Sequence, residues 1–248
     1  MSSNPAASVR PLKKDHRAPH EKRLPFASDQ LKQFFTSTFY QSCAPGSPTP
    51  YTKLDHGWRM WLPLIMLYSG ARPNEIAQLR VTDLKKSAGG SWYLDLTASG
   101  DDDHAKQLKT QTSRRRIPLH HELVKCGLLR FVTERSEQGG SEADLFPTLK
   151  PNKYGNRAWY PVKRLNEVFL PNVIQLGADQ SLYSLRHNVR DALRTVSAPP
   201  EALQAITGWS DGKQVSDHYG DPGNPDFYVK WVDAISYPGL DLSFLHVK

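Results

Sequence analysis

Residues 181–193 read SLYSLRHNVRDAL, and this stretch decides how the rest of the sequence is interpreted. Ser184 is a candidate N-cap, and the residues after it follow a helical pattern, which predicts a helix from this point. Tyr183 and Arg186 have a Y-x-x-R spacing across the start of that helix, and His187 follows directly. The sequence therefore predicts a helix whose first turn carries functional side chains.

Three further segments carry candidate functional residues. Upstream, GARPNEIAQLRVTDL places Arg72 after a tight glycine turn at a helix start, with Glu75 three residues on. Lys109 lies in LKTQTSRRRIPL, within a small basic β insert. Downstream, GWSDGKQVSDHYG places Trp209 and Tyr219 ten residues apart around a short helix. Each segment alone is typical of an ordinary surface, so only the combination points to a function.

Together these residue types suit the cleavage of a DNA strand by transesterification. Tyrosine offers a hydroxyl nucleophile. The guanidinium groups of Arg72 and Arg186 match the geometry of a phosphate and stay charged at any working pH. Lys109 is the best candidate for the general acid on the leaving 5′-oxygen, because the pKa of a lysine is adjustable. Since guanidinium groups neutralise the phosphate charge, we expect no metal and no other cofactor.

The order and spacing of these segments resemble the tyrosine recombinase family, the phage-integrase type of site-specific DNA recombinase. The family pattern is G-x-R-x-x-E, a hairpin lysine, H-x-x-R-H, G-H or G-W, and then a tyrosine. The matching residues are Gly70, Arg72 and Glu75, then Lys109, Tyr183, Arg186 and His187, then Gly208 and Trp209, and last Tyr219. The resemblance implies that Tyr219 forms a 3′-phosphotyrosyl bond, that Arg72, Lys109, Tyr183, Arg186 and Trp209 are catalytic, and that Glu75 and His187 support them.

Two positions depart from the commoner pattern. Tyr183 stands where the family usually has histidine. A phenol can donate a hydrogen bond to a phosphate oxygen, but its ordinary pKa of about 10 makes it a poor proton shuttle near neutral pH. Trp209 stands where histidine is commoner, and its indole N–H can donate one hydrogen bond while its ring packs. The placement of these side chains fits, whereas the acid–base role of Tyr183 does not.

The charge distribution indicates a polyanionic partner. The chain of 248 residues has a net charge of +7, and the first 23 residues hold six Lys/Arg against two Asp/Glu. Two basic patches remain, 105–117 and 146–164, and the second also holds Tyr154, Trp159 and Tyr160. A surface of this composition suits a nucleic-acid backbone. The candidates for phosphate contacts are Arg115, Arg116, Lys153 and Arg157.

The hydrophobic pattern predicts a mainly α fold with a small antiparallel β-sheet (α+β), which matches the tyrosine recombinase/integrase catalytic-domain fold. Residues 1–23 are expected to be a disordered basic tail or leader, and 24–248 one catalytic domain. The expected strands are 91–99 and 114–119. The expected helices lie at 28–39, 55–68, 73–79, 120–135, 156–174, 184–196, 199–207 and 211–219.

The resemblance implies double-stranded DNA as the partner, a homotetramer on synapsed sites, and a role in DNA integration or recombination. Family members usually carry an N-terminal DNA-clamping domain, and here the tail is expected to lead almost directly into the catalytic part, either as an excised domain or as a natural minimal form. The apolar C-terminal stretch is expected to pack either on a neighbouring protomer or on its own domain. No membrane span or signal peptide is indicated, and two cysteines, Cys43 and Cys126, without ligand spacing favour a reducing cytoplasm.

Three alternatives stay open. A type IB topoisomerase-like enzyme would use the same chemistry on a single duplex. A catalytically weak or inactive DNA-binding module would keep the fold, and the tyrosine at position 183 gives that interpretation weight. A metal-dependent nuclease is suggested by the acidic run 101–103 with His104, and by His120 and His121, although consecutive loop residues seldom converge on one ion.

Overall fold

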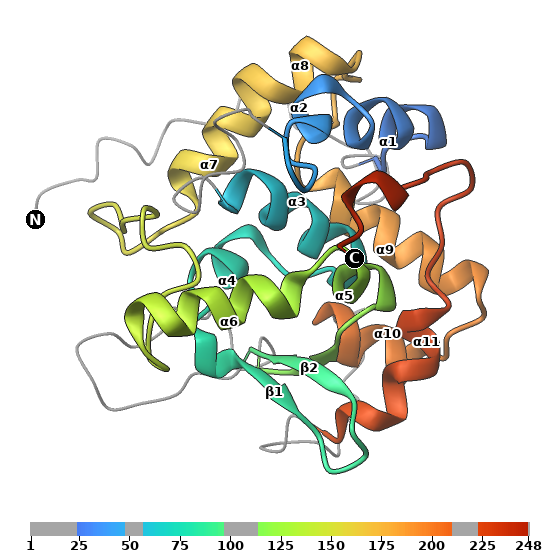
Figure 1. Cartoon of the computed structure of the whole chain (residues 1–248). Helices are drawn as coiled ribbons and strands as arrows, with labels where there is room; N and C mark the ends of the chain where they lie inside the picture. The colour runs from blue at the N-terminus through green and yellow to red at the C-terminus, as the bar shows by residue number, and fades with distance from the viewer. Residues whose placement is uncertain (1–23, 48–56, 97–113, 210–222, 248) are drawn as a thin grey trace, which may run out of the picture.

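Helix α3 (Gly57–Ser69) forms the centre of the molecule because most of its side chains are apolar and buried. Leu62, Leu64 and Ile65 have no exposed surface, and the helix packs against α4 (Pro73–Ala77) and α9 (Ser184–Thr195). In this computed structural model the described residues are 24–47, 57–96, 114–209 and 223–247. The expected tail, 1–23, lies outside them. Figure 1 shows α3 between the sheet and the group formed by α1, α2 and α8.

The described chain is mainly helical with one small antiparallel sheet, as predicted. The remaining helices are α1 (Ser28–Phe35), α2 (Thr38–Gln41), α5 (His121–Lys125), α6 (Leu128–Gly139), α7 (Trp159–Arg164), α8 (Leu170–Val173), α10 (Pro200–Thr207) and α11 (Val229–Asp233). Short 3₁₀ segments are η3 (Val81–Asp83), η6 (Pro225–Tyr228) and η7 (Ser243–Leu245), and η5 (Leu165–Phe169) is a π-helix. No helix of the described chain is long and apolar enough to cross a membrane.

The sheet has the order β1-β2-β3, and its inner face joins the core. Strands β2 (Trp92–Asp95) and β3 (Arg116–Pro118) confirm the two expected strands. Leu94 pairs with Ile117 and both are fully buried. Strand β1 (Leu84–Lys86) was not predicted, because three residues are too short to show an alternating pattern.

Two of the expected helices are interrupted. Between α1 and α2, the hydroxyls of Thr36 and Ser37 donate to the backbone oxygens of Lys32 and Phe34, which ends the first helix. Between α5 and α6, Gly127 has a φ of 90°, and a Cβ at this position would lie 2.8 Å from Cγ1 of Val247. Close approach of the C-terminal residues therefore breaks the helix expected at 120–135.

The described C-terminal segment packs on its own chain. Val232, Ile235 and Leu245 are buried in the common core. The Tyr237 hydroxyl donates to the backbone oxygen of Leu67 at 2.6 Å, and the Val247 N–H donates to that of Lys125 at 2.9 Å. In this single chain, the described C-terminal residues thus pack on the same domain.

Candidate active site

The candidate active site is organised around the buried carboxylate of Glu75. This residue occupies the first turn of α4, and its side chain is 5% exposed. One carboxylate oxygen accepts the backbone N–H of Arg72 at 2.6 Å, and the other accepts Nη1 of Arg72 at 2.7 Å. The G-x-R-x-x-E spacing thus places the glutamate three residues beyond the helix cap, where it fixes both the backbone and the guanidinium of Arg72.

A second guanidinium, that of Arg115, holds the other side of the same carboxylate. Nη1 and Nη2 of Arg115 donate to the two Glu75 oxygens at 3.1 and 2.8 Å. Nε donates to the backbone oxygen of Ile206 at 3.0 Å, in the last turn of α10. Arg115 is only 3% exposed, so it does not fit the expected role of a surface phosphate contact. From its position just before β3, it instead connects α4 and α10 at the site.

The third guanidinium belongs to Arg186, on the first turn of α9, and it is 3% exposed. It donates to the backbone oxygen of Gly70, the first residue of the G-x-R-x-x-E motif, and to that of Thr207 at 3.0 Å. These bonds use two of its five N–H donors. Because Arg115 and Arg186 hold consecutive carbonyls of α10, they satisfy the end of that helix just before Trp209.

This arginine cluster, consisting of Arg72, Arg115 and Arg186, contains three positive charges around one carboxylate. Burial by itself would raise the pKa of Glu75, but the charges and hydrogen bonds of Arg115 and Arg72 lower it to about 2. Burial and the neighbouring charge of Arg115 lower the pKa of Arg186 to about 9, although Glu75 acts in the opposite direction. A pKa of about 9 keeps Arg186 charged at neutral pH, and a site that gathers three guanidinium groups suits an anion.

Trp209 lies at the edge of the arginine cluster, against one face of α9. Its ring centroid is 5.4 Å from the guanidinium carbon of Arg186, 5.0 Å from that of Arg190, and 4.9 Å from the ring of His187. These distances place two cations over the indole. The sequence analysis did not single out Arg190. Its spacing of four residues from Arg186, on one helix face, is the signal that could have identified it.

Tyr183 precedes α9 and is 40% exposed, as expected for a side chain facing a ligand. It lines an open hollow of about 370 Å³ together with Asp179, Ser184 and His187. The Ser184 side chain accepts the backbone N–H of Ser181 at 3.1 Å and so fixes the turn before the helix. Tyr183, Arg186 and His187 therefore meet at one end of α9, as the sequence predicted.

Several expected site residues lie outside the described part of the chain. They are Lys109, Tyr219 and the acidic run 101–103 with His104, together with the helix expected at 211–219. The residues that flank these segments are described. Leu96 donates its backbone N–H to Arg115 at 2.9 Å, and Nη1 of Arg116 lies 3.5 Å from the backbone oxygen of Gly223. The described residue just before 97–113 and the described residue just after 210–222 therefore both lie beside the start of β3.

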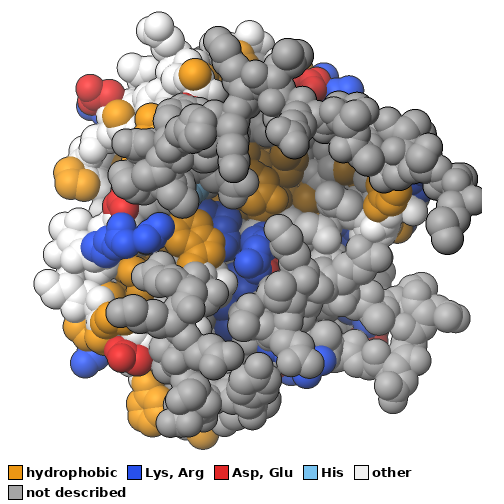
Figure 2. All heavy atoms as spheres, turned by 180° about the vertical axis from the view of Figure 1, so that it is seen from behind, with side chains coloured by type: hydrophobic (Ala, Val, Ile, Leu, Met, Phe, Trp, Pro, Cys, Tyr) orange, Lys and Arg blue, Asp and Glu red, His pale blue; other side chains and the backbone are white. Residues whose placement is uncertain are grey.

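The basic segment 146–164 lies next to the arginine box. Asn74 accepts the backbone N–H groups of Arg157 and Ala158 at 2.8 and 3.2 Å. Lys153 is exposed and stacks on Tyr154, and Trp159 and Tyr160 are 44% and 41% exposed. Figure 2 shows Lys and Arg side chains beside apolar ones near the centre of one face.

The charges of two other candidates for DNA contact are partly satisfied within the chain. Arg157 forms a 2.5 Å ion pair with Asp144. The side chain of Arg116 is 33% exposed and lies 3.9 Å from Asp95. Each can still face a phosphate, but an internal carboxylate already offsets part of its charge.

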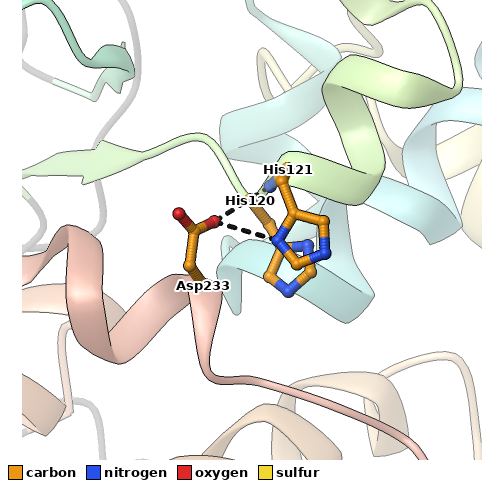
Figure 3. Close-up of side chains that lie close together, drawn as sticks. All are labelled: His120, His121 and Asp233. Atoms are coloured by element: carbon orange, nitrogen blue, oxygen red, sulfur yellow. Dashed lines mark hydrogen bonds and ion pairs between the residues drawn. The ribbon is translucent and has the colours of Figure 1, made fainter.

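A separate cluster of His120, His121 and Asp233 places three potential metal ligands within 4.8 Å of one another (Figure 3). Nδ1 of His120 accepts the backbone N–H of Glu122, and its Nε2 lies 2.9 Å from the oxygen of Ile235. Asp233 accepts the backbone N–H of His121 at 3.0 Å. Because both nitrogens of His120 are engaged, the cluster fits a helix cap and the attachment of α11 better than a metal site.

The molecule has the catalytic-domain fold of tyrosine recombinases and integrases. It is similar to the integrase from mycobacterium phage Brujita over 96% of this chain and 66% of that one, with a TM-score of 0.51 and 15% identity. The Tn1549 transposon integrase, in complex with the DNA of the transposon right end, has 20% identity over 80% of this chain and 61% of that one, with a TM-score of 0.45. This chain thus spans less than two thirds of the second integrase and about two thirds of the first. A scan against models of protein families and a search of curated proteins find no match.

The Arg115→Met substitution should lower the free energy of unfolding by about 3–5 kcal/mol, because it leaves a buried carboxylate and a helix end without a partner. Urea unfolding at pH 7 measures the change. The matched control is Arg116→Met, whose partly exposed ion pair should contribute less than about 1 kcal/mol. Equal losses in the two variants would contradict the positioning role of Arg115.

Acid should selectively remove the stability contributed by Glu75. Its folded pKa of about 2 lies below the ordinary value of 4.5, so its contribution is fully present above pH 4.5 and declines as the pH falls towards 2. We expect about 3 kcal/mol between wild type and Glu75→Gln at pH 7, and a smaller difference at pH 3. Urea unfolding at several pH values tests this. Glu142→Gln, at a 71% exposed side chain, is the control and should follow wild type throughout.

Proposed function

We propose that this chain is the catalytic unit of a site-specific DNA recombinase that cuts and rejoins strands through a 3′-phosphotyrosyl intermediate. The observation that carries the proposal is the arginine cluster, which brings Arg72, Arg115 and Arg186 together near Glu75. Planar guanidinium groups gathered at one place suit the recognition of a phosphate. The similarity to integrases supports the fold alone, while the arrangement of the residues supports the chemistry.

In the proposed cleavage step, the scissile phosphate binds at the exposed edge of the arginine cluster. Arg72, whose side chain is 22% exposed, and Arg186 donate hydrogen bonds to the non-bridging oxygens and stabilise the charge that develops on them. Glu75 holds the guanidinium of Arg72, and the backbone oxygens of Gly70 and Thr207 hold that of Arg186. The indole N–H of Trp209 offers one more donor beside them.

The nucleophile and the general acid are proposed from the sequence pattern. The Tyr219 oxygen attacks phosphorus, the bond from phosphorus to the 5′-oxygen breaks, and Lys109 protonates that oxygen. The competing tyrosines fit structural roles. Tyr237 donates to a backbone oxygen and burial raises its pKa well above the ordinary value, while Tyr228 is half-buried in η6.

The proposed partner is double-stranded DNA, bound across the arginine cluster and the adjoining basic segment. Asn74 connects the two surfaces, because it lies between Arg72 and Glu75 in α4 and holds the backbone of 157–158. Lys153, Arg157 and Arg116 would contact phosphates of the flanking duplex. Assembly of four copies on paired sites belongs to the same proposal.

A second candidate function is a DNA-binding module of the same fold with weak or no catalysis. Tyr183 at the usual histidine position favours it, because a phenol exchanges protons poorly at neutral pH. Such a module would bind duplex DNA through the same positive surface but would form no covalent intermediate. The next experiment separates the two functions.

Wild-type protein incubated in EDTA with pooled nicked duplexes should form a covalent protein–DNA adduct that survives a denaturing gel. Tyr219→Phe should form none, because a phenylalanine ring has no oxygen to attack phosphorus. Tyr228→Phe is the control and should keep the adduct.

Three other outcomes have distinct meanings. Binding without an adduct from wild type would favour the inactive module. Cleavage that requires added Mg²⁺ would overturn the tyrosine mechanism. Efficient relaxation of a supercoiled circle without exchange between sites would assign the topoisomerase-like activity instead.

Binding to duplex DNA should weaken steeply with salt, with a slope of about −0.9 per phosphate contacted. Lys153→Gln should reduce the magnitude of that slope by about 0.9, and Arg157→Gln by less, because Asp144 already offsets its charge. Fluorescence anisotropy from 50 to about 300 mM salt measures both. Arg130→Gln, at an exposed residue paired with Glu134 on α6, controls for a simple loss of net charge. A salt-independent affinity would contradict the backbone-contact model.

A further inference from the structure

The turn that precedes α7 is ordered by its own hydrogen bonds and holds an aromatic ring in solvent. The side-chain oxygen of Asn152 accepts the backbone N–H groups of Tyr154 and Asn156 at 2.9 and 3.0 Å. The backbone oxygen of Asn152 accepts the N–H of Gly155 at 2.8 Å. Gly155 has a φ of 74°, which a residue without a side chain adopts at little cost. Tyr154 is therefore exposed on a turn of fixed shape.

The same turn is attached to the arginine box. The Asn156 side chain accepts the backbone N–H of Ala158 at 2.8 Å, and Asn74 accepts the N–H groups of Arg157 and Ala158. Asn74 lies in the first turn of α4, two residues after Arg72. These bonds fix the position of the turn relative to the arginine cluster, although Figure 1 shows the chain between α6 and α7 extending away from the rest of the described fold.

Two further exposed aromatic side chains, Trp159 and Tyr160, begin α7. Their ring centres are 5.9 Å apart and their planes differ by 69°, so the rings do not cover each other face to face. The ring of Tyr160 also lies 5.9 Å from that of the buried Trp58 in α3, which holds it against the core. Segment 154–160 thus exposes three large aromatic side chains. We call Tyr154, Trp159 and Tyr160 the aromatic platform.

The charges that accompany the aromatic platform are positive. Residues 150–164 contain five Lys/Arg and no Asp/Glu. The ammonium of Lys153 lies 5.0 Å from the ring centre of Tyr154, which places a cation for a phosphate beside a flat face for a base. Lys163, at the end of α7, is exposed as well. Flat rings interspersed with positive charge complement nucleic acid, whose bases stack and whose phosphates are anionic.

We propose that the aromatic platform stacks on unpaired bases of the DNA beside the arginine cluster, so that the protein prefers a locally unpaired duplex to a fully paired one. In a paired duplex the neighbouring bases cover both faces of each base, whereas an unpaired base can offer a face to an aromatic side chain. The inference rests on the proposed DNA partner and deepens it, because it names the structural form of that DNA.

Such a preference would assist the proposed strand exchange. A strand that passes from one duplex to another must leave its partner bases beside the cut. A surface that binds the unpaired form more tightly than the paired form shifts the equilibrium towards it by the difference in affinity. Lysines beside the rings would hold the phosphates of either form, so the rings alone distinguish the two.

The experiment compares two end-labelled duplexes of equal length by fluorescence anisotropy. One is fully paired, and the other has a central bubble of unpaired thymines. Wild type should bind the bubble at least about tenfold more tightly, because both contain the same number of phosphates and differ in exposed bases. Tyr154→Leu and Trp159→Leu should each weaken binding to the bubble by about five- to a hundredfold and leave binding to the paired duplex within about twofold. Trp159→Phe keeps a flat ring and should keep most of the preference.

Two controls separate stacking from other effects. Phe227→Leu changes an aromatic residue of matched exposure, 70% against 71% for Tyr154, and should leave the preference unchanged. Lys153→Gln should weaken binding to both duplexes by the same factor, because it removes a phosphate contact. Urea unfolding checks that each variant is folded.

Equal affinities of wild type for the two duplexes would overturn the inference, as would a preference that survives in Tyr154→Leu/Trp159→Leu. Equal weakening of both duplexes by the leucine variants would also overturn it, because the rings would then contact the backbone alone. Binding is measured without cleavage, so the preference in a protein that forms no covalent adduct would support the aromatic platform and refute the recombinase. An adduct without the preference would do the reverse. If wild type binds neither duplex, both proposals fall.

Discussion

The ion pair between Arg115 and Glu75 is the interaction on which the rest of the site depends. The pair spans 40 residues of sequence and links the residue just before β3 to α4, and Arg115 also holds the last turn of α10. Glu75 in turn fixes both the backbone and the guanidinium of Arg72. This ion pair therefore connects α4, α10 and the start of β3.

The same carboxylate lies among several cations. Arg72 and Arg115 donate to Glu75, and Arg186 lies close by, where burial and the positive charge of its neighbours lower its pKa. Guanidinium groups match the geometry of a phosphate, so under the proposed function this cluster would receive the phosphate of the DNA backbone.

Local signals made much of this predictable from the sequence. The apolar run of α3, the proline at the start of α4 and the helical pattern after Ser184 each depend on neighbours within a few residues. The features that the sequence did not predict depend on residues that are far away along the chain. The helix expected at 120–135 breaks at Gly127 because Val247 approaches it from the far end of the chain. The burial of Arg115 likewise depends on Glu75 and Ile206, which no local pattern reveals.

The run of three arginines before Ile117 shows how strand geometry divides identical residues between tasks. Successive side chains of a strand point to opposite faces, so Arg115 turns inward to Glu75 while Arg116 lies on the side of Asp95 and Gly223. Arg115 thereby holds the backbone oxygen of Ile206, shortly before Trp209. Arg116 lies beside the backbone oxygen of Gly223. Two adjacent arginines, Arg115 just before β3 and Arg116 at its start, therefore hold the described chain on both sides of 210–222.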